Sequence, residues 1–198
     1  VNTMAPLKIN DVTLKLTGDL LNYHAELKGG VDGMDYIPAS KVDLNADGKL
    51  YEVTVNKLGI ASLDGKSEFV GTANWKEGAN WDVQADLEKM NIGFYVPVMP
   101  ATLSGKLHSR GFAGSQGWQV EVPVADLNGT LSSNPISLKG SATLNQNVLL
   151  TVPDLQVRYG ENHLNARGVG AAPGDFVLDV DGPTLGGLGW DLSGNEHG

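Results

Sequence analysis

Residues 81–88 read Trp-Asp-Val-Gln-Ala-Asp-Leu-Glu, with an apolar residue at every odd position and a polar residue at every even one. A period of two places successive side chains on opposite faces of a β-strand, whereas a helix repeats every 3.6 residues. The stretch therefore predicts a strand that is apolar on one face and polar on the other.

The same period recurs along most of the chain, for example in residues 12–17, 118–122 and 136–144. Short segments rich in Gly, Asn, Asp or Pro separate the alternating runs, and no run shows helical spacing. The 26 glycines and 9 prolines also exceed what helical proteins carry. We therefore expect an all-β protein of about 15 short strands, joined as antiparallel hairpins in a meander.

An open sheet of about 15 strands must bend, because open sheets rarely pass ~10 strands without curling or splitting. Two outcomes follow: a sandwich whose apolar faces meet, or an elongated curved trough whose apolar lining stays exposed. With ~4.8 Å between strands, such a trough would be on the order of 70 Å long. Pro123 and Pro153 interrupt strand-like runs and predict edge positions or bulges.

The chain shows no internal boundary, so residues 1–198 are treated as a single segment. A weak internal repeat aligns residues 58–71 with 155–168, and each segment precedes a strand that begins with an aromatic residue, Trp81 or Phe176. The period is roughly 100 residues and is typical of an elongated stack.

Composition narrows the range of possible functions. A net charge of −9 opposes binding to nucleic acid and to anionic membrane surfaces. The absence of cysteine excludes disulfides and thiolate chemistry but leaves the compartment open. Val1 to Pro6 has neither the basic nor the apolar region of a signal peptide, so the chain is expected to be an internal fragment of a longer protein.

No enzyme signature is found. The sequence contains no nucleophile elbow and no P-loop, and its four histidines lie far apart. Asp43, Asn45 and Asp47 match half of a calcium loop, but Thr54 stands where the closing Glu belongs, and a strand ending in an Asp-Gly turn explains the segment better. We predict no catalytic residue, metal or cofactor, and disfavour a carbohydrate-active β-helix enzyme because no acidic cluster converges.

The candidate functional site is the apolar face itself. Its large apolar residues alternate with polar ones in every run. Each of three predicted strands begins with an aromatic residue, Trp81, Trp118 or Phe176, which could either anchor a closed core or line an open trough. The predicted lining consists of Val12, Leu14, Leu16, Val42, Leu44, Val53, Val55, Trp81, Val83, Leu87, Trp118, Val120, Val122, Ile136, Leu138, Leu144, Leu155, Val157, Phe176, Leu178 and Val180.

The order of these motifs resembles the TamB family, within the wider AsmA-like group. Leu-x-Gly-x is followed by Gly-x-x-Trp-x-Val and then by a strand ending in Gly-x-Asn-x-Leu. The best stretches are Leu103-Ser-Gly-Lys-Leu through Gly117-Trp-Gln-Val-Glu-Val, and Leu149 to Tyr159 followed by Gly160-Glu-Asn-His-Leu-Asn-Ala-Arg-Gly168.

The resemblance implies a β-taco, which is a long curved sheet with an apolar groove. It also implies a periplasmic location in a Gram-negative bacterium, an inner-membrane anchor, and an outer-membrane partner, TamA. Such proteins are thought to conduct phospholipids from the inner to the outer membrane and to support outer-membrane protein assembly. We expect the membrane helix and the TamA-docking segment to lie outside this sequence, so that TamA binds elsewhere in the protein, whereas lipid acyl chains would lie in the groove.

A different class also fits the strand pattern. A β-solenoid or sandwich repeat of a surface adhesin would seal the apolar face and bind through outer loops. The two hypotheses differ in whether the apolar face is covered.

Overall fold

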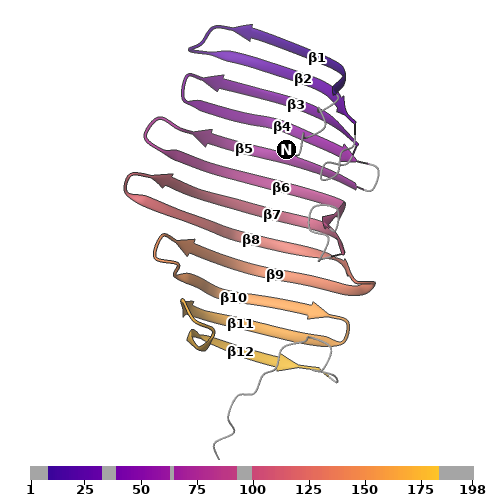
Figure 1. Ribbon diagram of the computed structural model, residues 1–198, viewed down its shortest axis with the longest axis vertical. Helices are drawn as coiled ribbons and strands as arrows, with labels where there is room; N and C mark the ends of the chain where they lie inside the picture. The colour runs from indigo at the N-terminus through magenta and orange to yellow at the C-terminus, as the bar shows by residue number, and fades with distance from the viewer. Residues whose placement is uncertain (1–8, 33–38, 63–64, 93–99, 183–198) are drawn as a thin grey trace, which may run out of the picture.

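The computed structural model describes residues 9–32, 39–62, 65–92 and 100–182. These residues form one open antiparallel sheet in which each strand is hydrogen-bonded to the next strand in the chain (Figure 1). The strands are β1 (Ile9–Gly18), β2 (Tyr23–Val31), β3 (Ser40–Lys49), β4 (Glu52–Ser62), β5 (Gly65–Asn74), β6 (Ala79–Asn91), β7 (Ala101–Gly114), β8 (Gly117–Leu131), β9 (Asn134–Asn145), β10 (Leu150–Tyr159), β11 (Asn162–Gly170) and β12 (Phe176–Asp181), with a 3₁₀ turn η1 (Pro173–Asp175) before the last.

The all-β prediction is confirmed, but the strand count was wrong. The described sheet has 12 strands instead of about 15, because three strands each join two segments that the alternation predicts as separate strands. These are β4, predicted as 50–56 and 58–63, β8, predicted as 118–125 and 127–132, and β10, predicted as 148–152 and 155–159. Each of these strands contains a bulge, at which the polar–apolar alternation slips by one residue. Twelve strands at ~4.8 Å give a sheet on the order of 50 Å long.

The bulges have a regular place in the sheet. Val55 of β4 pairs with Gly71 of β5, and the next pair is Leu58 with Phe69. The pairing therefore moves three residues along β4 but only two along β5. The same slip separates Val122 from Ala125 in β8, and Val152 from Leu155 in β10. Pro123 and Pro153 lie inside the last two slips, where a missing N–H breaks no regular ladder bond. The prediction that these prolines mark bulges is confirmed.

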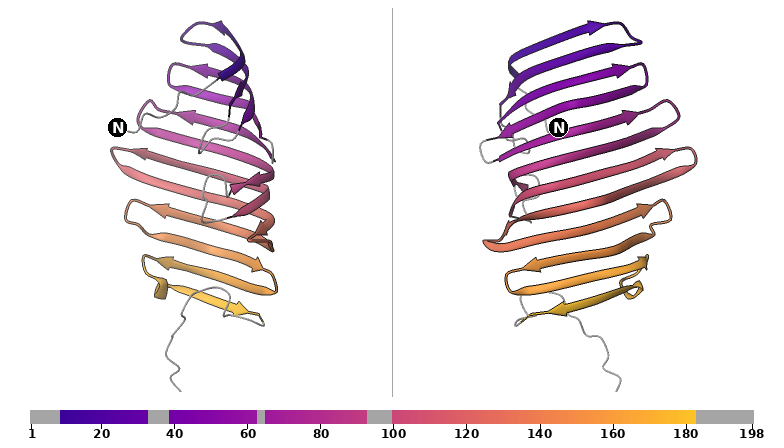
Figure 2. Two further views of the ribbon diagram at one scale, coloured as in Figure 1. Left: turned by 45° about the vertical axis from the view of Figure 1, so that its right-hand side comes forward. Right: turned by 180° about the vertical axis from the view of Figure 1, so that it is seen from behind.

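No second layer lies on either face within the described residues. Apart from η1, which contacts β11, each strand has its extensive contacts with its sheet neighbours, and β1 and β12 form the two ends (Figures 1 and 2). The described part of the chain is therefore a single open, bent sheet of the taco-like kind, and it does not form a sandwich. No helix among these residues is long and apolar enough to span a bilayer.

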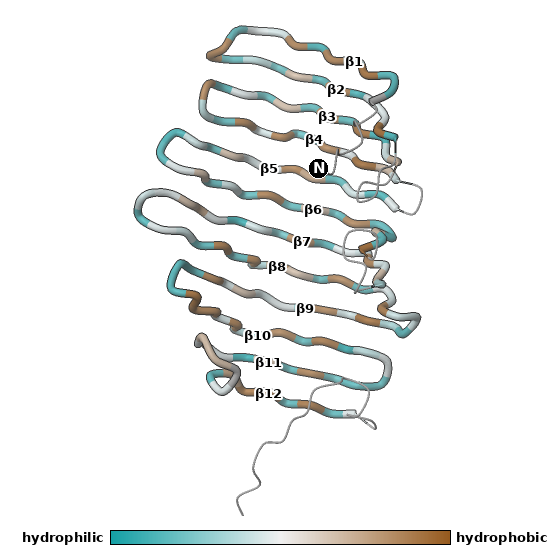
Figure 3. Tube along the Cα trace, viewed as in Figure 1, coloured by the Kyte–Doolittle hydropathy of each residue, from teal (hydrophilic) through white to brown (hydrophobic). Residues whose placement is uncertain are grey.

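The tightest packing lies on one side of the sheet. The buried apolar residues are small ones, Ala46, Ala85, Ala101 and Ala125, together with Val152. Ala85, for example, lies between Phe69 on β5 and Leu107 on β7, whose larger side chains cover it. Figure 3 shows the alternation behind this arrangement, because apolar and polar residues follow one another along each strand.

The two segments aligned as a repeat adopt similar hairpins. Residues 58–71 and 155–168 each begin directly after a bulge and end on a glycine with φ of 157°. Gly71 pairs with Val55, and Gly168 pairs with Val152, so the two glycines occupy matching positions relative to the bulges.

Candidate functional site

The strand register places apolar side chains in continuous rows across the sheet. Residues directly opposite each other in an antiparallel pair point to the same face, so a row can be followed from strand to strand. One row crosses every strand without a polar residue: Leu14, Leu27, Leu44, Leu58, Phe69, Ala85, Leu107, Ala125, Gly140, Leu155, Ala166 and Leu178.

All of the predicted lining residues lie on the face that carries this row, which we call the apolar face. A parallel row, for example, joins Leu138 to Val157 and, through Leu164, to Val180. The bulges make this possible, since each slip returns the next apolar residue to the same face. Without the slip after Val122, the second half of β8 would point the opposite way.

Several residues of the apolar face were not predicted. They follow a bulge or sit opposite a predicted residue, and only the register reveals their side. They include Leu27, Leu58, Ile60, Phe69, Leu103, Leu107, Leu127 and Leu164. A sequence signal did exist for some of them, because Pro123 and Pro153 mark two of the slips.

The apolar face is only partly shielded from water. Its large side chains on the inner strands are mostly half-buried, because neighbouring strands supply contacts on two sides only. On the end strand β1, Leu14 and Leu16 are 63% and 65% exposed. Soluble monomers rarely leave so long a continuous apolar surface open, and such surfaces mark binding sites.

The opposite face, which we call the polar face, carries cross-strand ion pairs. The Arg110 guanidinium forms two hydrogen bonds of 2.7 and 2.8 Å with the Glu121 carboxylate. These bonds raise the pKa of Arg110 and lower that of Glu121. Lys106 with Asp86 and Lys139 with Asp126 are looser pairs, at 3.8 and 3.7 Å. Solvated pairs of this kind keep the polar face hydrated and contribute little to the stability of the fold.

The half-motif for calcium belongs to this network. Asp43, Asn45 and Asp47 all project from β3 on the polar face, as the strand interpretation predicted, although Asp47-Gly48 lies within β3 and not in a turn. Asp47 contacts His24 and Asn56, and Asp43 pairs with Lys57. Among the described residues, no group of three acidic or histidine side chains could hold a metal ion.

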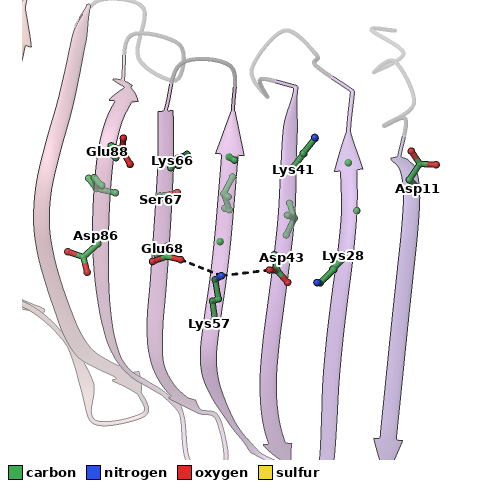
Figure 4. A pocket seen from close by; sticks show the side chains of 17 residues that line it. Asp11, Lys28, Lys41, Asp43, Lys57, Lys66, Ser67, Glu68, Asp86 and Glu88 are labelled. Atoms are coloured by element: carbon green, nitrogen blue, oxygen red, sulfur yellow. Dashed lines mark ion pairs between the residues drawn. The ribbon is translucent and has the colours of Figure 1, made fainter.

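A hollow of about 730 Å³ also opens on the polar face, near one end of strands β2 to β6 (Figure 4). Gly30, Gly59 and Ala61 leave the space free, and Lys57 bridges Asp43 at 3.8 Å and Glu68 at 3.6 Å beside it. The rim mixes lysines with carboxylates in similar numbers, so it offers no net field for an anion or a cation. The hollow is a weaker candidate than the apolar face.

Comparison with known proteins decides the family. The sequence-family model of the TamB N-terminal domain matches residues 1–198 of this chain. The chain belongs to the TamB family. It is 81% identical over all of its 198 residues to the translocation and assembly module subunit TamB of Haemophilus influenzae, and it spans 15% of the length of that relative. No solved structure matches it.

For this TamB chain, the resemblance seen in the motifs is confirmed. Among the residues that the structure describes, the apolar face is the one extended feature that suits a ligand, because it is continuous over all 12 strands and bears no charged side chain along the central row. Such a surface can shelter hydrocarbon but offers no donor or acceptor that would fix a polar ligand in one place.

Proposed function

We propose that the apolar face of this TamB chain lines a groove that shelters phospholipid acyl chains in the periplasm. The observation that carries the proposal is the uninterrupted apolar row across a sheet that no second layer covers within the described residues. The groove supports movement of phospholipid from the inner to the outer membrane, and through it the assembly of outer-membrane proteins. TamA binds parts of the protein outside this chain.

The energetics favour such a role. Each methylene exposed to water costs about 0.8 kcal/mol, so an acyl chain of about 14 methylenes meets a barrier on the order of 10 kcal/mol in open water. A continuous apolar lining removes most of that cost. Because Val, Leu and Ala contacts are weak and similar along the row, no position traps the chain. Transfer then requires neither a catalytic residue nor a cofactor.

A charged side chain at the centre of the lining tests the proposal. Leu138 lies on the apolar face, opposite Leu127 on β8 and Val157 on β10, whereas its neighbour Ser137 lies on the polar face. In the intact protein, we expect Leu138→Asp to abolish lipid transfer, because an acyl chain would cover an unpaired carboxylate at a cost of several kcal/mol. Without lipid the carboxylate is hydrated, so the free energy of unfolding should fall by only about 1 to 3 kcal/mol.

Ser137→Asp is the matched control and should leave transfer unchanged. Transfer between donor and acceptor vesicles and thermal unfolding are measured for both variants. If the loss of folded Leu138→Asp protein fully accounted for its loss of lipid transfer, the result would count against a conduit. A Leu138→Asp protein that folds and still transfers lipid would also count against it.

A further inference from the structure

One long rim of the sheet carries exposed apolar side chains at its hairpin turns. The turns that join β1 to β2, β3 to β4, β5 to β6, β7 to β8 and β9 to β10 lie along the same rim, which we call the tip rim (left in Figure 1). Leu20 is 78% exposed, the highest value among the exposed large apolar residues described. The exposed apolar residues at these turns are Leu20, Leu21, Leu50, Tyr51, Trp75, Val148 and Leu149.

The turns do not need these apolar side chains for their own structure. The Asp19 carboxylate accepts hydrogen bonds from the backbone N–H groups of Leu21 and Asn22, at 2.8 and 2.9 Å. Asn145 accepts from the N–H of Asn147 in the same way. Polar neighbours therefore close the turns, as is usual, and the apolar side chains project from them without such a role.

Aromatic residues gather just behind these tips. On the apolar face, the Tyr23 ring lies against Gly48 and the Trp81 ring against Gly111. Trp118 follows the turn between β7 and β8. Among the described aromatic residues, only Phe69 and Tyr159 lie away from the tip rim and its adjoining strand ends: Tyr23, Tyr51, Trp75, Trp81, Phe112, Trp118 and Phe176 all lie near it.

Several of these aromatic groups have free polar atoms. Trp81 donates its Nε1–H to Ser109 at 3.2 Å, but Tyr23, Tyr51 and Trp118 make no side-chain hydrogen bond within the described residues. Tyr159, near the opposite rim, accepts a bond from Asn134 at 3.0 Å. Tyr and Trp with an apolar ring and an unpaired donor are the side chains that favour the layer between lipid headgroups and acyl chains.

We propose that the tip rim contacts the glycerol–ester layer of a bound phospholipid, so that the headgroup lies beyond the tips and the acyl chains run along the strands over the apolar face. This inference rests on the proposed function and adds an orientation to it. A zwitterionic headgroup suits the rim, because charges of opposite sign stand side by side there, as in Lys76 and Glu77.

The dimensions agree with this orientation. From Trp81 to Leu87 a strand covers about 20 Å at ~3.3 Å per residue. The acyl layer of one membrane leaflet is about 15 Å thick, half of the ~30 Å hydrocarbon core. A chain whose ester group lies at Trp81 therefore passes Ala85, which is about 13 Å away at ~3.3 Å per residue, and ends just short of Leu87. The described turns on the opposite rim, residues 132–133 and 160–161, carry Ser, Ser, Gly and Glu and give no comparable anchor.

Two photoreactive phosphatidylethanolamines test the orientation in the intact protein. One carries a diazirine on the headgroup amine and the other carries it at the end of an acyl chain, and labelled peptides are identified by mass spectrometry. We expect the headgroup probe to label the peptides of Tyr51, Trp75 and Trp118 several-fold more than that of Tyr159. We expect the acyl probe to label those of Leu87 and Leu138.

Headgroup labelling at Tyr159, or equal labelling of both rims, would overturn the orientation but leave the proposed groove intact. Absence of labelling on the apolar face by either probe would overturn the groove and, with it, this inference. A matched pair of variants adds a second readout. Trp75→Ser should reduce headgroup labelling several-fold and Val70→Ser should not, since Val70 is similarly exposed (43% against 47%) but lies on the polar face. Equal effects of the two variants would also contradict the orientation.

Discussion

At the scale of single residues, some residues determine the shape of the sheet, whereas others lie on its surface without affecting that shape. Gly105 belongs to the first kind. It lies within β7 with φ of 135°, and a Cβ placed there would come within 2.1 Å of the Asp126 carbonyl oxygen on β8. Only glycine combines that backbone conformation with so close an approach of the next strand.

We therefore predict that Gly105→Ala destabilises the fold, by about 1 to 3 kcal/mol or more, because it adds both backbone strain and a clash. Gly174→Ala is the control, since nothing lies within 4 Å of a Cβ at that position. Its effect should stay within about 0.5 kcal/mol. Chemical denaturation of both variants measures the difference, and a Gly105→Ala protein as stable as Gly174→Ala would show that the close approach is wrong.

His24 on the polar face gives a prediction about pH. Its ring nitrogen lies 2.8 Å from the Asp47 carboxylate, and this hydrogen bond raises the pKa of His24 above 6.5. The pKa of Asp47 is lowered below 3.8 by hydrogen bonds from Asn56 and His24. A raised histidine pKa stabilises the fold fully below the unfolded value, and this contribution fades as the pH rises through the folded value.

Two measurements check this prediction. A titration of His24 by NMR should give a pKa above 6.5, and Asp47→Asn should bring it back toward 6.5. The stability lost in His24→Gln should be larger near pH ~5.5 than near pH ~8.5, though small because the pair is solvated. An unchanged pKa in Asp47→Asn, or a loss that grows with pH, would contradict the assignment.

At the scale of elements, the bulge explains what sequence reasoning could and could not reach. The period of two was sufficient to predict the strand type and the shared face of residues as distant as Val12 and Val180. It could not join residues 50–56 to 58–63, because the slip after Val55 looks like a break between two strands. Whether such a break is a turn or a bulge depends on pairing with the next strand, which a single sequence does not show.

This view predicts opposite outcomes for two single-residue deletions. Deleting Pro123 removes the extra residue of the β8 bulge, so Val122 and Ala125 keep their face and the strand regains regular alternation. Deleting Lys139 from the regular part of β9 moves every residue beyond it to the other face. We expect the first deletion to leave a folded but less bent protein and the second to abolish folding of this region.

Limited proteolysis and thermal unfolding distinguish the two deletions, and lipid transfer reports the loss of bend. If deletion of Pro123 proved as disruptive as deletion of Lys139, the bulge would have a role other than restoring the face. If neither deletion had an effect, the strand register itself would be wrong.

At the scale of the whole molecule, one sheet presents two faces of different chemistry. Cross-strand charge pairs such as Arg110 with Glu121 keep one face hydrated, and the row from Leu14 to Leu178 keeps the other apolar. Sequence reasoning identified the apolar face through its alternation and the family through its motifs. That a second layer is absent from the described part of the chain could not be predicted, because a trough and a sandwich have the same pattern of alternation.

The most direct test is photo-crosslinking in living cells from a benzophenone side chain placed at position 138 of the intact protein, with position 137 as the control. The two positions are adjacent in β9 but face opposite sides of the sheet. We predict a phospholipid-sized adduct from position 138 and none from position 137. Equal adducts from both positions, or none from position 138 in a folded protein, would contradict the claim that the apolar face holds lipid.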